Sequence, residues 1–437
     1  MQKACNTWLD YIIQAPHYAH SEQTQLCAHR VQGISNSGKI DLLRVYLIEL
    51  TKPIVEDLMK VIVQQQQLAH GVNVVSRAVT SRSTLPVLSN ILIKTDEGRL
   101  RLSATNLELG ISAWLGAKVS EDGGLTVPSR TFSDLVTNLP NEDVILTVDE
   151  RTQSLNVKCG TLNTDIKGIS ADEFPPMPTP DDESAIPLNV ENFKEMIQRV
   201  AFAASTEDTR PNLTGVHMSF QGDVLEMAAT DGYRISISKA AIGHKPSQNL
   251  EALIPARALS ELSRIAVNGD ETLLMSFPAG RGQVIFHLKD AELVSQLIEG
   301  NFPNYTAIIP STFKTRTVLN TAQLLKACKQ TEIIAREGSY IARLDIQPEA
   351  GSTGSGPQME ISATSEQTGS SEVIVDASVD GVPLLISFNI RFLREALEVI
   401  KTANVLLETN AANTPGMLRP VGDDSFRHII MPMNVNR

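Results

Sequence analysis

A short pattern of a small residue, alanine, threonine and a polar residue occurs three times in this chain. It reads SATN at residues 103–106, AATD at 228–231 and SATS at 362–365. The alanines before threonine, at positions 104, 229 and 363, are 125 and 134 residues apart, and a typical domain holds about 100 to 150 residues. The spacing therefore predicts one fold repeated three times. Only the middle copy continues into Gly-Tyr-Arg, which suggests a role that the other copies lack.

The apolar periodicity predicts the same element order in each copy, namely strand, helix, strands, helix and strands. Phe193, Ile197 and Val200, for example, are spaced by four and three residues, which places them on one face of a helix that covers a sheet. Helices are expected over residues 66–82, 129–139, 191–205, 256–267, 321–337 and 389–401. The third copy is expected to close with a hairpin between residues 405–409 and the last strand of the chain.

The charges of the chain are divided unevenly between helices and strands. The 437 residues are too many for one ordinary core, and the net charge of -12 argues against a general coat on nucleic acid. The six expected helices nevertheless sum to +5. A mildly basic helical face on an acidic body can hold DNA through its phosphates without reading bases. The alternative is that these basic residues lie on ordinary solvated helix faces.

The sequence contains no recognisable catalytic or metal-binding pattern. The four cysteines, at 5, 27, 159 and 328, show no Cys-x-x-Cys spacing, so a reducing cytoplasm is expected. There is no phosphate-binding loop, and the acidic cluster of Asp181, Asp182 and Glu183 is expected to be a solvated loop. Two alternatives of other classes are a metal-dependent nucleotidyltransferase, which would need convergent carboxylates on strands, and a repeat scaffold that binds peptides but not DNA.

The first 58 residues differ from the rest of the chain. They hold three of the six tyrosines and two of the four cysteines, and they contain no copy of the repeat. No secretory signal is expected, because Asp10 and its polar neighbours interrupt any apolar core. We expect residues 1–58 to be a disordered extension or to lie upstream of a true start at Met59, with an accessory element as the alternative.

Four segments carry a family resemblance. They read STLPVLSN at 83–90, ATDGYR at 229–234, GNFPNY at 300–305 and MPM at 431–433. Because these four segments occur in the order typical of that family, residues 59–437 resemble the bacterial DNA polymerase III beta subunits, the replicative sliding clamps. The resemblance implies an α+β DNA clamp fold with three similar domains, at 59–178, 179–310 and 311–437. It also implies inward-facing helices and an outer antiparallel sheet.

The same resemblance implies a function. The subunit would form a ring-shaped homodimer that encircles duplex DNA without sequence specificity and acts as a processivity factor. No catalytic site, cofactor or metal is implied, and no membrane partner. The implied protein partners are the replicative polymerase alpha subunit, the clamp loader and other proteins with a clamp-binding motif. They would dock in a peptide groove between the second and third domains.

The resemblance also implies site residues. The groove would be lined by Leu213, Thr230, Gly232, Tyr233, Arg234, Ile235, Pro303 and Ile308, and closed by Ile429, Ile430, Met431, Pro432 and Met433. Aliphatic and methionine side chains suit the burial of a partner's Leu or Phe. Contacts to DNA would come from Arg82, Arg130, Arg210, Arg257 and Arg264.

This chain departs from the family pattern at three places. Ala307 stands where relatives often have arginine, which puts one polar contact of the groove in question. Pro211 and Asn212 stand where some relatives have aromatic residues, next to Arg210. Residues 434–437 extend past the usual end of the family.

Overall fold

The computed structural model describes residues 58–80, 85–149, 151–180, 185–246, 250–266, 272–278, 280, 282–348 and 356–433. Met59–Arg437 form one compact unit. The expectations for residues 1–57, for the acidic cluster at 181–183 and for residues 434–437 fall outside the described residues. Arg82 falls outside them as well.

Six α-helices occur in the described ranges, and each corresponds to one of the expected helices. They are α4 (Gln65–Ser76), α5 (Ser129–Thr137), α6 (Val190–Val200), α7 (Ala256–Ile265), α8 (Thr321–Ala335) and α9 (Ile390–Val399). All six end earlier than expected. After α6 and α8 the chain tightens into 3-10 turns, Ala201–Ala203 and Arg336–Gly338, which satisfy the last carbonyls of a helix and continue its apolar spacing.

Asparagine side chains begin three of these helices. Asn189, Asn320 and Asn389 each accept a hydrogen bond from a backbone N–H of the first turn of α6, α8 and α9. An asparagine cap satisfies one of the N–H groups that have no partner inside the helix. The helices α5 and α7 instead follow Pro128 and Pro255, whose fixed backbone angle suits the entry to a helix. Local sequence therefore marks where five of the six described helices begin.

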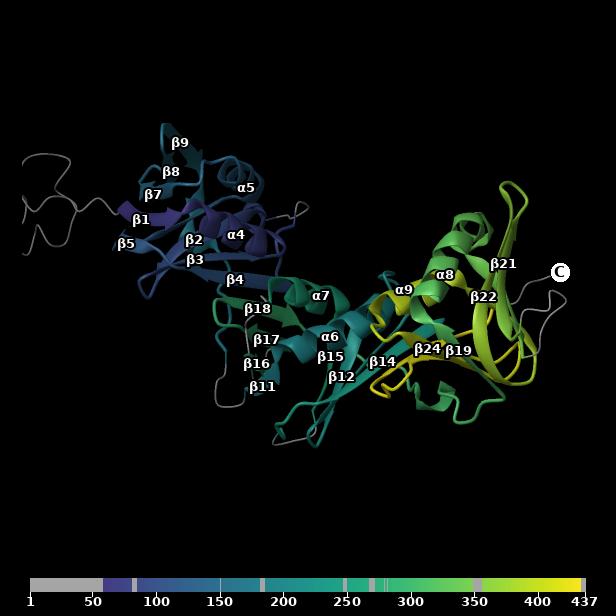
Figure 1. The fold of residues 1–437 in the computed structure, drawn as a ribbon. Helices are drawn as coiled ribbons and strands as arrows, with labels where there is room; N and C mark the ends of the chain where they lie inside the picture. The colour runs from purple at the N-terminus through teal and green to yellow at the C-terminus, as the bar shows by residue number, and fades with distance from the viewer. Residues whose placement is uncertain are drawn as a thin grey trace, which may run out of the picture. The chain divides into compact units, whose positions relative to one another are not determined.

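The strands form three sheets (Figure 1), and every strand pair whose register is described is antiparallel. The five-stranded sheet has the order β5 (Lys118–Glu121), β1 (Leu58–Gln64), β7 (Asp143–Asp149), β8 (Ser154–Cys159) and β9 (Leu162–Lys167). The nine-stranded sheet has the order β10 (Ile169–Ser170), β6 (Gly124–Pro128), β2 (Asn90–Asp96), β3 (Arg99–Thr105), β4 (Leu109–Leu115), β18 (Ala291–Gln296), β17 (Gln283–His287), β16 (Thr272–Ser276) and β11 (Ile186–Asn189).

The twelve-stranded sheet extends from the second domain through the third. Its order is β15 (Leu250–Pro255), β12 (Gly215–Gln221), β13 (Val224–Thr230), β14 (Arg234–Ala241), β26 (Phe426–Ile430), β25 (Gly416–Pro420), β24 (Asn404–Thr409), β19 (Thr315–Asn320), β22 (Gly369–Gly381), β21 (Gln358–Ser365), β20 (Ile341–Gln347) and β23 (Leu384–Asn389). The expected hairpin between 405–409 and the last strand is wrong, because β24 pairs with β25 and β26 follows as the next strand.

Two strand pairs join successive domains into continuous sheets. Strand β4 of the first domain pairs with β18 of the second, with Gly110 opposite Val294. Strand β14 of the second domain pairs with β26 of the third, with Ile235 opposite Ile429. Backbone hydrogen bonds therefore connect the first domain to the second and the second to the third, as the expected outer antiparallel sheet requires.

The helices cover the sheets with the apolar faces that periodicity predicts. In α6 the buried side chains include Phe193, Ile197 and Val200, and these residues belong to a core cluster that spans the first two domains. A second cluster fills the third domain. Within the described ranges, none of the helices combines the length and the apolar character that crossing a membrane requires.

Candidate peptide groove and DNA-facing helices

The turn after the middle signature is held by its own side chains. Thr230 Oγ1 donates to Arg234 O at 2.6 Å and accepts from Gly232 N–H at 3.0 Å. Asp231 Oδ1 accepts from the N–H groups of Tyr233 and Arg234, at 2.9 and 3.1 Å. Gly232 has a φ of 94°, a left-handed conformation that glycine adopts without steric cost. Threonine, aspartate and glycine are therefore residue types that suit this turn.

The end of the chain lies against this turn. Strand β26 pairs with β14, and Met431, just past β26, donates its N–H to Tyr233 O at 2.9 Å. Met433 then donates its N–H to Ser387 O on β23 at 2.8 Å. The middle signature and the MPM segment, which are about half the sequence apart, thus meet at the junction of the second and third domains.

The residues predicted for the groove divide by exposure. Tyr233, Ile308 and Met431 are 57%, 42% and 37% exposed, and four more of the predicted residues are exposed or partly exposed, namely Gly232, Pro303, Pro432 and Met433. The other predicted residues are buried, namely Leu213, Thr230, Arg234, Ile235, Ile429 and Ile430. Only the first group can contact a partner directly without rearrangement, and the second group supports it from beneath.

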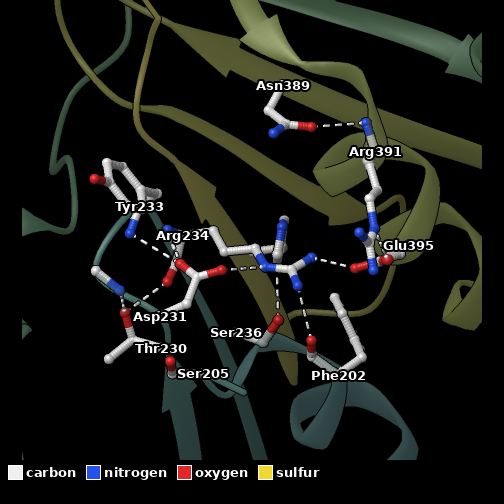
Figure 2. Close-up of polar contacts among 12 residues, drawn as sticks. Phe202, Ser205, Thr230, Asp231, Tyr233, Arg234, Ser236, Asn389, Arg391 and Glu395 are labelled. Carbon is white, nitrogen blue, oxygen red and sulfur yellow. Dashed lines mark hydrogen bonds and ion pairs between the residues drawn. The ribbon is translucent and has the colours of Figure 1, made fainter. Parts of the chain in front are cut away.

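Arg234 connects the turn to the third domain (Figure 2). Its guanidinium donates from Nε to Asp231 Oδ2 at 3.0 Å, from Nη1 to Glu395 Oε2 at 2.6 Å and from Nη2 to Phe202 O at 2.8 Å. It also lies over the ring of Phe392, 4.3 Å from the centroid. Because its donors are taken up and its side chain is buried, Arg234 positions the turn rather than offering a free charge to a ligand.

Glu395 bonds arginines from both the second and the third domain. Besides Arg234, it accepts from Arg391 Nε at 2.7 Å (Figure 2). Burial alone would raise the pKa of Glu395, but the hydrogen bonds and charges of Arg391 and Arg234 outweigh it, so the pKa is lowered. The carboxylate is therefore ionised at neutral pH, and the buried guanidinium of Arg234 is neutralised.

His428 is buried on β26 at the same junction. Its Nδ1 lies 2.6 Å from Ser236 Oγ on β14, and its ring lies against that of Phe202, with centroids 5.5 Å apart. Burial, and then the positive charge of Arg234, lower the pKa of His428 well below its ordinary value. The imidazole is therefore neutral in the folded protein.

Acidification is expected to destabilise this junction through His428. The unfolded chain takes up a proton near pH 6.5 and the folded chain does not, so the stabilisation is full above that pH and falls by up to about 1.4 kcal/mol per unit below it. Urea unfolding between pH 7 and 5 measures this slope. The His428→Gln variant should show a shallower slope, and identical slopes in the two proteins would rule His428 out as the titrating group.

Arg210 lies beside the turn rather than on a helix. It is exposed, and its Nη1 stands 3.6 Å from the position that a Cβ on Gly232 would occupy. Pro211 begins the short 3-10 turn Pro211–Leu213, and Asn212 Nδ2 donates to Asn301 O at 3.1 Å. Arg210 thus lies next to a residue predicted for the groove, and its contact with DNA stays a prediction.

Two of the arginines predicted to contact DNA occupy one position in two domains. Arg130 and Arg257 are each the second residue of their domain's second helix, α5 or α7, and both are exposed. Arg264 lies in the last turn of α7, where its Nη1 bonds Glu261 Oε1 at 2.6 Å. Arg391, which the sequence did not single out, is likewise the second residue of its domain's second helix, α9. Aligning the starts of the three second helices brings out this correspondence.

The chain was compared with known proteins. Three family models match it: the DNA polymerase III beta subunit N-terminal domain over residues 59–178, the central domain over 187–304 and the C-terminal domain over 306–434. The beta sliding clamp of Synechococcus elongatus is 33% identical over 382 residues, which cover 86% of this chain and 100% of the relative. The beta sliding clamp of Bacillus subtilis is 29% identical over 385 residues, 86% of this chain and 99% of the relative.

Solved structures agree with these relatives. The sliding clamp of Bacillus subtilis superposes with a TM-score of 0.80 at 28% identity, over 86% of this chain and 100% of that one. The DNA polymerase III beta subunit of Thermotoga maritima gives a TM-score of 0.78 at 25% identity, with the same coverage. Three domains of helices and antiparallel sheet, joined by shared sheets, define the DNA clamp fold.

The chain belongs to the DNA polymerase III beta subunit family, the beta sliding clamps of bacteria. As a beta subunit it is the processivity factor of DNA polymerase III in DNA replication, a part of the holoenzyme without catalytic function. DNA and the polymerase are the partners that this role implies.

Proposed function

We propose that two subunits close head to tail into a ring around duplex DNA, and that the ring tethers the polymerase and other proteins through the peptide groove between the second and third domains. The observation that carries the proposal is a pair of strand edges without a neighbour. Among the described residues, β9 ends the five-stranded sheet, and residues 369–376 of β22 pair with β21 on one edge only.

The repeat indicates what these two edges bind. Strands β4, β14 and β22 each follow a copy of the signature, and the first two pair with β18 and β26 of the next domain. Six of the seven residues of β4 are buried, whereas β22 has one buried residue among 13. Strand β9 forms a hairpin with β8, as β18 and β26 do with their preceding strands. We therefore expect β22 to pair with β9 of a second subunit, twice in a closed dimer.

Contacts between helices support the same arrangement. Arg77, which follows α4, bonds Glu261 of α7 at 3.1 Å, and Lys401, which follows α9, bonds Glu195 of α6 at 3.2 Å. The first helix of one domain thus meets the second helix of the next. In the described part of the chain α8 has no following domain, and it exposes 62% of Ile333 on a shallow, mostly apolar face that also includes Leu325. Burial of Ile333 against α5 of the second subunit would complete the series.

The DNA contacts are proposed to be weak and independent of sequence. Arg130, Arg257 and Arg391 share one helical position in the three domains. Arg264 and Arg82 are further candidates. Some helical cations are paired, as Arg394 is with Glu332 and Glu398, and Arg391 itself bonds Glu395 through Nε. A few phosphate contacts give little affinity at physiological salt, so retention on DNA would come from the closed ring.

The groove is proposed to take an extended peptide with Leu or Phe side chains. Tyr233, Ile308 and Met431 offer exposed apolar surface around the turn, and the methionine adapts to different side chains. Arg210 beside Gly232 offers a charge for a backbone carbonyl or carboxylate of the peptide. The partners would be the polymerase alpha subunit, the clamp loader and other proteins that carry a clamp-binding motif.

Retention on circular DNA tests the ring. The subunit is loaded by a bacterial clamp loader onto nicked circular duplex DNA, and bound protein is separated by gel filtration at about 150 mM salt, where isolated phosphate contacts are weak. We expect retention on the circle, loss on linearisation, and recovery when the linear ends are blocked with streptavidin. Equal loss from circular and linear DNA would contradict the ring and would favour a peptide scaffold that does not encircle DNA.

Removal of residues 431–437 is expected to abolish peptide binding and to leave the dimer intact. The deletion takes away Met431 and the hydrogen bond of its N–H to Tyr233 O, but it leaves the whole of β26 and its pairing with β14. Fluorescence polarisation with a labelled peptide that carries adjacent Leu and Phe measures the loss, and sedimentation confirms the dimer. Unchanged peptide affinity would contradict the assignment of the groove.

A further inference from the structure

The junction of the first and second domains repeats the turn of the proposed groove. Thr105 Oγ1 donates to Leu109 O at 3.1 Å and accepts from Leu107 N–H at 3.0 Å. Asn106 Oδ1 accepts from the N–H groups of Glu108 and Leu109, at 3.0 and 2.7 Å. These are the hydrogen bonds that the threonine and aspartate of the middle signature make. The two turns are therefore the same structure built from different residues.

The backbone of this first turn is strained. Leu107 has a φ of 77° at the position where the middle copy has glycine, and a left-handed conformation costs a residue with a side chain about 1–2 kcal/mol. Leu107 is also about half exposed. The geometry of the turn is thus kept in the first copy although its sequence does not favour it.

The strands around the two turns correspond residue by residue. Gln296 donates its N–H to Glu108 O at 2.8 Å, and Met431 donates its N–H to Tyr233 O at 2.9 Å. Glu108 therefore corresponds to Tyr233, and Gln296 corresponds to Met431. The pairing of each strand with its neighbouring domain extends the match to Gly110, which corresponds to the isoleucine after Arg234 in β14.

The two junctions differ in what fills their centre. In the middle copy the centre is filled by the buried side chain of Ile235, the residue that corresponds to Gly110. In the first copy Gly110 has no side chain, and Met177 of the linker lies against it instead, so that its Cε would clash with any Cβ at position 110. The space that remains is a cavity of about 220 Å³, and Glu108, Gln283 and Gln296 give it polar walls.

We infer that this junction is a second copy of the peptide groove that the chain itself keeps closed. Met177 is its internal occupant, and Glu108 and Gln296 replace the tyrosine and methionine that would bury an apolar side chain. One consequence is that each subunit has one docking site rather than two, although its fold contains the geometry for both. The inference rests on the proposed function of the groove between the second and third domains.

The inference is tested by introducing residues of the proposed groove between the second and third domains at the junction of the first and second domains. The variant carries Gly110→Ile, Met177→Ala, Glu108→Tyr and Gln296→Met, and the probe is the labelled peptide with adjacent Leu and Phe. Isothermal titration calorimetry is expected to give one peptide per subunit for the unaltered chain and two for the variant. In chains that lack residues 431–437, the expected numbers are zero and one.

These four numbers separate the possible failures. No binding to the unaltered chain would overturn the proposed groove itself. One peptide per subunit for both full-length proteins, with similar melting temperatures, would overturn the closed second copy and leave the proposed groove standing.

If the variant with four substitutions does not fold, a double-mutant cycle of melting temperatures still tests the inference. Gly110→Ala is expected to lower the melting temperature of the unaltered chain, because the new Cβ collides with Met177, and to lower it less in the Met177→Ala background. Equal effects in the two backgrounds would overturn Met177 as the occupant.

Discussion

A subunit with Ile333→Asp is expected to be a monomer that does not remain on circular DNA. Ile333 is exposed on the face of α8 proposed to meet α5 of the second subunit. An aspartate there would have to be buried in an apolar contact, at a cost of about 3 kcal/mol or more per interface, which weakens association by at least about 100-fold. Analytical ultracentrifugation over a concentration series measures the dimer, and the nicked-circle assay measures retention.

Val224→Asp provides a matched control for this prediction. Val224 is a partly exposed apolar residue of β13, distant in the sheet order from the free edges of β9 and β22. It receives the same charge, and it should leave the protein dimeric and retained on the circle. A dimeric Ile333→Asp protein would contradict the proposed interface. Monomers of both variants would show that the charge acts through the fold rather than through the contact.

Arg234→Ala is expected to lower the free energy of unfolding by about 3–5 kcal/mol, because it leaves two largely buried carboxylates without their shared partner. The side chains of Asp231 and Glu395 are 17% and 15% exposed, and the guanidinium also binds Phe202 O at 2.8 Å. Peptide affinity is expected to fall with stability, since the turn that carries Tyr233 loses its anchor to the third domain. Urea unfolding and fluorescence polarisation at pH 7 measure the two effects.

Arg234→Lys distinguishes charge from geometry in this effect. A lysine keeps the positive charge but cannot reach Asp231, Glu395 and Phe202 O with a planar set of donors. Compared with Arg234→Ala, we expect Arg234→Lys to recover part of the free energy of unfolding and little of the peptide affinity. Full recovery of peptide affinity by lysine, or normal affinity in the alanine variant, would show that Arg234 does not position the turn.

Much of the fold was predictable because its information is local. The threefold signature gave the number of domains, and the apolar spacing of Phe193, Ile197 and Val200 gave α6 and its buried face. Capping residues such as Asn320 mark the helix starts, whereas the ends of α6 and α8 were extended too far because 3-10 turns continue the same spacing. The resemblance of dispersed motifs, more than any single pattern, led to the family.

The pairing of strands from different domains was not predictable in the same way. An isolated strand such as β26 has the apolar pattern of any half-buried strand, and nothing local in the pattern says that its neighbour is β14 rather than β24. The same limit applies to the site. Tyr233 and Ile429 were both expected at the groove, but only the tyrosine is exposed, because the isoleucine faces a cluster that includes Ile237 and Met417.

The pairing of β14 with β26 has a consequence for how the protein folds. It joins Arg234 to Ile430, so the rest of the second domain and almost the whole third domain lie in a loop between two neighbouring strands. Closing such a loop is slow unless the intervening chain is already compact. The third domain should therefore fold first and deliver its last strand to the second. The surface for partner proteins would appear only at that final docking step, so a partly folded subunit could not compete for the polymerase.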